Sequence, residues 1–85
     1  MPSKTVTVGS RIGLHARPAA LIAEAANAVD SAVTIGAVGG APVDAGSALL
    51  LMTLGAKYGD QVVVSSDDQA SLDKVADLVQ QDLDA

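Results

Sequence analysis

The stretch QVVVSSDDQASLDKVADLVQQDL, residues 61–83, contains a strand signal and a helix signal in immediate succession. Residues 61–65 form a β-branched run that is typical of a strand. Between residues 72 and 83 the apolar side chains instead recur at every third or fourth position, which predicts an amphipathic helix. Ser66 and Gln69 have the spacing of a capping box and predict the start of that helix. Strand followed by helix predicts a sheet that packs against helices.

The same two patterns alternate through the rest of the chain. Gly39-Gly40 predicts a hairpin turn before a short edge strand that contains Val43. Gly55 ends a short helix, because glycine is the usual residue past a helix C-terminus. In chain order, we expect strands at 4–8, 32–35, around Val43 and 61–65, and helices at 16–28, 48–54 and 72–83. This βαββαβα order predicts an α+β fold, an open-faced β-sandwich whose antiparallel sheet has one face buried under the two longer helices.

Composition limits what this domain can do. Eighty-five residues, 49% of them hydrophobic, are enough for a single domain over residues 1–85 with one core. The net charge of −5 argues against nucleic-acid binding, because phosphate backbones are held by clustered Lys and Arg. The apolar runs are well short of the roughly 20 residues of a membrane span, and the first residues do not resemble a signal peptide. We therefore expect a cytoplasmic monomer without membrane insertion.

The only histidine of the chain, His15, lies in the segment GLHARPA, residues 13–19. Gly13 breaks the preceding loop. Pro18 suits the first helical turn, because its missing N–H would be unpaired there in any case. A helix is therefore expected to begin within a residue or two of His15.

The start of this helix has the properties of an anion site. The N–H groups of Ala16 and Arg17 have no intrahelical partner, and a helix N-terminus carries a partial positive charge. Arg17 and Arg11 add two cations within four residues of His15. Imidazole is a good nucleophile near neutral pH, so the electrophile that fits this place is a phosphoryl group.

A structural interpretation of His15 stands beside the chemical one. A histidine at a helix start, taken by itself, is more often a polar cap than a nucleophile. Metal binding is disfavoured, since one histidine without cysteine cannot assemble a zinc shell and the carboxylates lack EF-hand spacing. We expect neither a metal nor another cofactor.

Two motifs together resemble a known family. GLHARPA followed by an alanine-rich helix, and GSALLLMTLGAKYGD at residues 46–60, resemble the HPr phosphocarriers of the bacterial phosphoenolpyruvate:sugar phosphotransferase system over the whole chain. The resemblance implies a four-stranded antiparallel sheet under three helices. It also implies that His15 takes a phosphoryl group on Nδ1 from phosphorylated enzyme I and passes it to the enzyme IIA domains of sugar permeases, with Arg17 steadying the group. Such a protein is a transfer intermediate and has no turnover of its own.

An alternative of a different class is a regulatory module of this fold that docks to other proteins without obligatory phosphotransfer. Ser47 is the expected N-cap of the short helix, and the resemblance also raises regulatory phosphorylation of this serine. The chain departs from the family pattern there, because Gly46 stands where a basic residue often precedes the serine.

The short helix is apolar on almost every side, and a domain of this size cannot bury all of them. If Leu51 and Leu54 face the sheet, Leu49 and Met52 must face outward. Exposed apolar patches often mark docking surfaces. The resemblance implies the same location and extends it to the start of the first long helix, where Ala20 lies.

Overall fold

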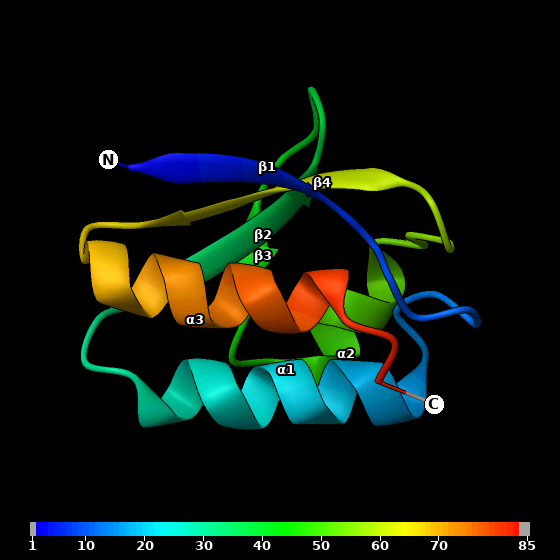
Figure 1. Cartoon of the computed structure of the whole chain (residues 1–85), viewed down its shortest axis with the longest axis horizontal. Helices are drawn as coiled ribbons and strands as arrows, with labels where there is room; N and C mark the ends of the chain where they lie inside the picture. Colours follow the sequence, from blue (N-terminus) through cyan, green and yellow to red (C-terminus); the bar gives the residue numbers. More distant parts are fainter. Residues whose placement is uncertain (1, 84–85) are drawn as a thin grey trace.

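The structure is a computed structural model that describes residues 2–83 (Figure 1). Its elements follow the predicted βαββαβα order. They are β1 (Ser3–Thr7), α1 (Ala16–Ala28), β2 (Val33–Ala37), β3 (Val43–Asp44), α2 (Ala48–Thr53), β4 (Gln61–Ser66) and α3 (Gln69–Gln80).

The four strands form one antiparallel sheet in the order β1-β4-β2-β3. β4 is central and pairs with β1, with Val63 opposite Thr5, and with β2, with Val64 opposite Ile35. Its even-numbered residues are buried and its odd-numbered residues are more exposed. This alternation means that the sheet buries one face only, as the sequence predicted.

All three helices contribute to the core on the buried face of the sheet. α3 lies alongside β1 and β4, and α1 packs against α3 and α2 (Figure 1). The prediction from periodicity gave this role to the two longer helices alone, but α2 buries Leu51 completely. The fully buried large side chains are Ile22, Ile35, Leu51, Leu72, Val8, Val33, Val62, Val64, Val75 and Val79. The open four-stranded sheet under three helices that the resemblance implied is confirmed.

The predicted start of α3 was wrong. Ser66 is the last residue of β4 and is fully buried, so it does not cap the helix. Asp68 is the N-cap instead, and its Oδ2 accepts hydrogen bonds from the Ser71 N–H at 3.0 Å and from the Ser71 hydroxyl at 2.6 Å. These bonds hold the pKa of Asp68 below its usual value.

The predicted end of α3 was also displaced. The helix ends at Gln80, although apolar spacing continued to Leu83. Leu83 packs against the core from beyond the helix, and its N–H donates to the Ser10 hydroxyl at 3.3 Å. The segment after Gln80 is irregular, although Leu83 has the spacing of a helical apolar residue. The other elements lie within one or two residues of their predicted ranges, and the turn at Gly39-Gly40 is present, with a hydrogen bond from Gly40 N to Ala37 O.

None of the helices described between residues 2 and 83 is both long enough and apolar enough to pass through a bilayer.

The loop between β1 and α1 is fixed to the rest of the fold on two sides. On one side Ser10, which is buried, donates from its hydroxyl to Gln81 O at 3.4 Å, at the C-terminal end of α3. On the other side the Leu14 N–H donates to Ala56 O at 3.0 Å, and the Leu14 side chain is buried in the core. Between them, the Gly13 N–H closes a turn onto Ser10 O. These hydrogen bonds fix the backbone that leads into α1 in one position relative to the core.

Gly13 is required in this loop for two reasons. Its φ of 74° lies in the left-handed region that favours glycine. A Cβ at this position would also come within 2.5 Å of Ala56 O and 3.0 Å of Lys57 Cα, which are backbone atoms that cannot easily move away. The glycine thus permits the close approach of two loops.

We predict that Gly13→Ala lowers the free energy of unfolding by about 2–4 kcal/mol, because it adds a steric clash to the cost of a positive φ. The matched control is Gly39→Ala. Gly39 has a φ of 78° but no atom within 4 Å of the position of a Cβ. Gly39→Ala should therefore lower the free energy of unfolding by only about 1 kcal/mol. Urea unfolding measures both variants, and equal losses would contradict the packing argument.

Candidate functional site

His15 is the N-cap residue of α1, and its side chain is exposed. Its backbone is extended, with φ −80° and ψ −175°, and its carbonyl accepts the first helical hydrogen bond from the Ala19 N–H at 2.8 Å. The imidazole makes no capping hydrogen bond. His15 therefore caps the helix with its backbone carbonyl only, and the interpretation of its side chain as a polar cap is wrong.

The first turn of α1 presents two free backbone donors beside this imidazole. Pro18 has no N–H to offer and is buried, which fixes the turn against the core. Within residues 2–83, the N–H groups of Ala16 and Arg17 donate to no other group, and both residues are exposed. The two unpaired N–H groups that the sequence predicted at this helix start are therefore present, and such donors can bind an anion.

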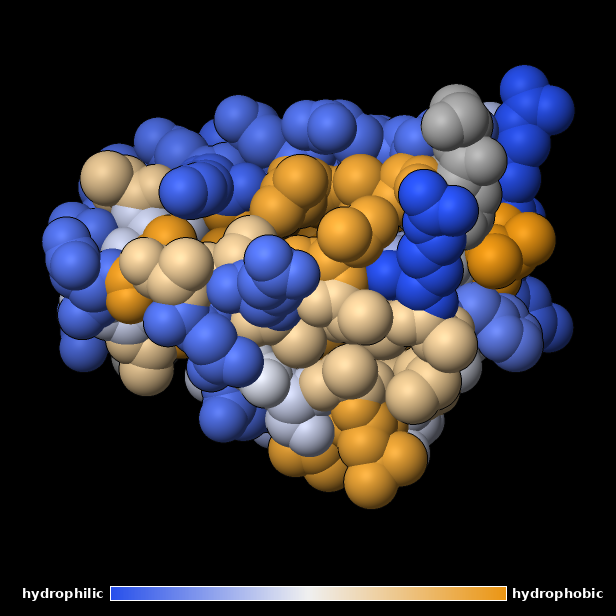
Figure 2. Space-filling model, turned by 90° about the horizontal axis from the view of Figure 1, so that it is seen from below, coloured by the Kyte–Doolittle hydropathy of each residue, from blue (hydrophilic) through white to orange (hydrophobic). Residues whose placement is uncertain are grey.

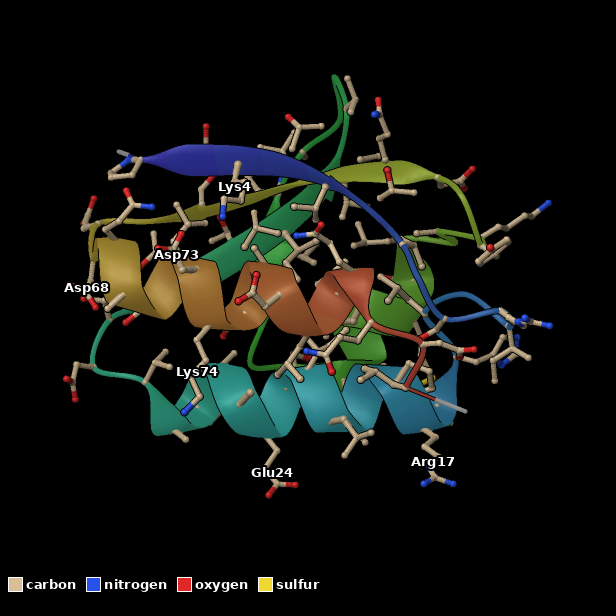
Figure 3. The ribbon with its side chains drawn as sticks, in the orientation of Figure 1. Lys4, Arg17, Glu24, Asp68, Asp73 and Lys74 are labelled. Carbon is tan, nitrogen blue, oxygen red and sulfur yellow. The ribbon has the colours of Figure 1, made fainter. Side chains whose placement is uncertain are left out.

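Arg17 and Arg11, the two cations predicted near His15, are not both directed at the imidazole. Arg17 extends from the start of α1 into solvent (Figure 3). Arg11 lies near Asp82, with 3.6 Å between Arg11 Nε and Asp82 Oδ2, so part of its charge is already balanced. Lys4 is remote and pairs with Asp73 at 3.2 Å. Hydrogen bonds from Gln69 and, secondarily, from Lys4 hold the pKa of Asp73 below its usual value.

A hollow of about 290 Å³ lies directly next to His15. It is lined by Ile12, Leu14, His15, Met52, Gly55, Ala56 and Lys57, and we call it the His15 hollow. It brings the loop before α1 together with the end of α2 and the residues that follow. Among residues 2–83, Lys57 is the one lysine or arginine in its lining, and no carboxylate lines it.

Sequence reasoning did not single out Lys57. Its proximity to His15 comes from the pairing of Leu14 N with Ala56 O, which joins segments that are far apart in the chain. Sequence patterns that span only a few residues cannot predict that contact. The family motif at residues 46–60 includes Lys57, but nothing within the motif distinguishes it.

Ser47 caps α2 as expected, with its Oγ accepting from the Leu50 N–H at 3.3 Å. It does not line the His15 hollow. The preceding Gly46 is enclosed by its neighbours, since a Cβ there would come within 2.4 Å of Asn27 Oδ1. Asn27 Nδ2, from α1, donates to Gly46 O at 3.0 Å and ties α1 to the loop before α2. A side chain of any kind at position 46 would disturb this contact.

The two faces of α2 are divided as the sequence predicted. Leu51 is fully buried and Leu54 is half-buried, whereas Leu49 and Met52 are 69% and 38% exposed. Ala20 is exposed on α1, the neighbouring helix. We call these three exposed residues, Ala20, Leu49 and Met52, the α1–α2 surface. Figure 2, which looks onto α1, shows that apolar side chains make up much of this side of the molecule.

Among residues 2–83, no three histidine, cysteine or acidic side chains come together in a group that could hold a metal ion. The chemistry that this place offers is that of an exposed imidazole beside free backbone donors. Such a group can accept a phosphoryl group and release it again.

Comparison with known sequences points to the same chemistry. Residues 2–81 match the family described as "PTS HPr component phosphorylation site". The chain is 41% identical to the phosphocarrier protein HPr of Streptomyces coelicolor over 87 aligned positions, which cover 99% of this chain and 94% of that protein.

Solved structures with the same fold carry the same name. An HPr phosphocarrier from Bacillus anthracis superposes with a TM-score of 0.85 at 30% identity, covering 93% of this chain and 96% of that one. HPr-C-His from Thermoanaerobacter tengcongensis superposes with a TM-score of 0.87 at 28% identity, covering 100% of this chain and 98% of that one.

Proposed function

Since the chain belongs to the HPr phosphocarrier family of the phosphotransferase system, we propose that His15 Nδ1 is the atom that carries its phosphoryl group. The observation that supports this proposal is the free imidazole at the start of α1, which has no capping hydrogen bond to lose when it reacts. An imidazole engaged as a cap would have to break that bond first.

The proposed transfer is a direct displacement at phosphorus. The lone pair of Nδ1 forms the new N–P bond as the bond between phosphorus and the donor's leaving group breaks. Passing the group on is the same step with the acceptor as nucleophile and His15 as leaving group. No oxidation or reduction occurs, and the protein returns to its starting state after each cycle. It is therefore a transfer intermediate and not an enzyme with its own turnover.

The first turn of α1 receives the charge that the phosphoryl group brings. The N–H groups of Ala16 and Arg17 donate to phosphoryl oxygens, and each charge-assisted bond of this kind contributes about 1.5–3 kcal/mol. The Arg17 side chain, which points into solvent (Figure 3), must turn toward the group to steady it. Water competes with each of these contacts on an exposed surface, so the group is held weakly enough to be passed on.

We propose phosphorylated enzyme I as donor and the enzyme IIA domains of sugar permeases as acceptors, with the protein acting as a monomer in the cytoplasm. The α1–α2 surface is the proposed docking site for both. The alternative, a docking module without phosphotransfer, would use the same surface but would have no need of a free imidazole at His15.

Regulatory phosphorylation of Ser47 has weaker support. Its hydroxyl already accepts a hydrogen bond as the cap of α2. Gly46 cannot be replaced by a basic residue without moving Asn27, so no cation precedes the serine to attract a phosphate donor. Capping remains the role that its contacts support.

We predict that His15→Ala abolishes uptake of label from phosphoenolpyruvate and enzyme I. The melting temperature should hardly change, because the lost side chain makes no cap bond and even a good cap contributes only about 1 kcal/mol. Arg17→Ala should slow transfer and leave the fold intact. An acid-labile label on the His15→Ala variant would contradict the assignment, and so would its unfolding.

A separate prediction concerns docking. Leu49→Asp or Met52→Asp should weaken binding of donor and acceptor by at least about tenfold, or roughly 1.4 kcal/mol, without unfolding the domain. Val38→Asp is a matched control, since Val38 is 61% exposed but follows β2, outside the α1–α2 surface. Titration calorimetry and thermal melting should be measured together. If either variant melts early yet binds normally when folded, the residue belongs to the core and not to the docking site.

A further inference from the structure

The His15 hollow contains a cation, Lys57, to which the proposed transfer assigns no role. A Cβ on Gly13 would be only 3.0 Å from Lys57 Cα, which shows that the backbone of Lys57 lies against the loop that leads into α1. The hydrogen bond from Leu14 N to Ala56 O, 3.0 Å long, holds the two segments together one residue before His15 and one before Lys57. The two residues therefore emerge from directly joined backbone.

A tight turn fixes the base of the Lys57 side chain. Asp60 Oδ2 accepts from the Lys57 N–H at 2.9 Å, and the Asp60 N–H donates to Lys57 O at 2.9 Å. The same turn is tied to the end of β1, since Val8 N donates to Asp60 O and Gly59 N donates to Val8 O. A long flexible side chain thus starts from a rigid point beside the histidine.

The ammonium group of Lys57 is available to an anion. Within residues 2–83 it has no ion pair, and Asp60 binds its backbone and not its Nζ. In the part of the chain that the structure describes, no carboxylate lines the hollow to compete for this charge. Arg11 differs, because Asp82 lies beside it.

We propose that Lys57 is a further catalytic residue, whose Nζ donates a hydrogen bond to the phosphoryl group while that group is on His15. It approaches from the side of α2, whereas the N–H groups of Ala16 and Arg17 approach from α1. Lys57 keeps its proton throughout, and the N–P bond forms and breaks as described above. This role rests on the proposed phosphorylation of His15.

The test uses the phosphorylated protein alone, so that docking to a partner does not affect the result. The protein is loaded with phosphoenolpyruvate and enzyme I, or with phosphoramidate, whose P–N bond breaks to release ammonia. ³¹P NMR then follows the pH at which the phosphoryl group loses its second proton. A nearby cation favours the dianion, so in Lys57→Ala this pH should rise by at least about 0.3.

Two further variants make the result specific. Lys57→Arg keeps the cation and should restore the original midpoint. Lys74→Ala removes the same charge from α3, toward the opposite end of the helix layer from Arg17 (Figure 3), and should leave the midpoint unchanged. Transfer from enzyme I should be slowed at least about threefold by Lys57→Ala and hardly at all by Lys74→Ala, consistent with a contact at the phosphoryl group.

The outcomes separate this inference from the function on which it rests. If neither donor places a phosphoryl group on His15, both proposals are overturned. If His15 is phosphorylated but the midpoints of Lys57→Ala and Lys74→Ala coincide, the role of Lys57 alone is overturned, and His15 remains the carrier.

Discussion

The hydrogen bond from Leu14 N to Ala56 O is the contact on which the site depends. It joins the loop before α1 to the loop after α2, and it is possible only because residue 13 has no side chain to separate them. Leu14 is buried in the core, and the next residue, His15, is the N-cap of α1 with its imidazole exposed. The same contact brings Lys57 into the His15 hollow. One backbone pairing therefore brings His15, the proposed nucleophile, and a cation into the lining of the same hollow.

The distribution of charge around His15 suits the proposed transfer, in which a bound phosphoryl group must also leave. The chain is acidic overall, with a net charge of −5, but Arg11, Arg17 and Lys57 lie at or near the start of α1. None of the three is buried, and Arg11 is partly balanced by Asp82. Exposed charge–charge contacts are weak because water and salt screen them. Several weak contacts can stabilise the phosphoryl group during transfer without making it a permanent ligand.

Local patterns in the sequence predicted the order of the elements and the start of α1, because alternation, helical spacing, Gly13 and Pro18 act over a few residues. They failed where distant contacts decide. Leu83 keeps helical spacing yet lies beyond α3, since its N–H is taken by Ser10. Ser66 has capping spacing yet is buried in β4, so Asp68 caps the helix. The proximity of Lys57 to His15 depends on a contact between loops, which no local pattern contains.

The proposed role of the α1 N-terminus in receiving the phosphoryl group is tested most directly by amide NMR of the protein before and after phosphorylation. New hydrogen bonds to phosphoryl oxygens should move the amide proton resonances of Ala16 and Arg17 strongly downfield. Residues of the sheet should change little, because the loop before His15 is already fixed by Leu14 and Ser10. Unchanged Ala16 and Arg17 amides, or changes spread through the sheet, would contradict this role of the helix start.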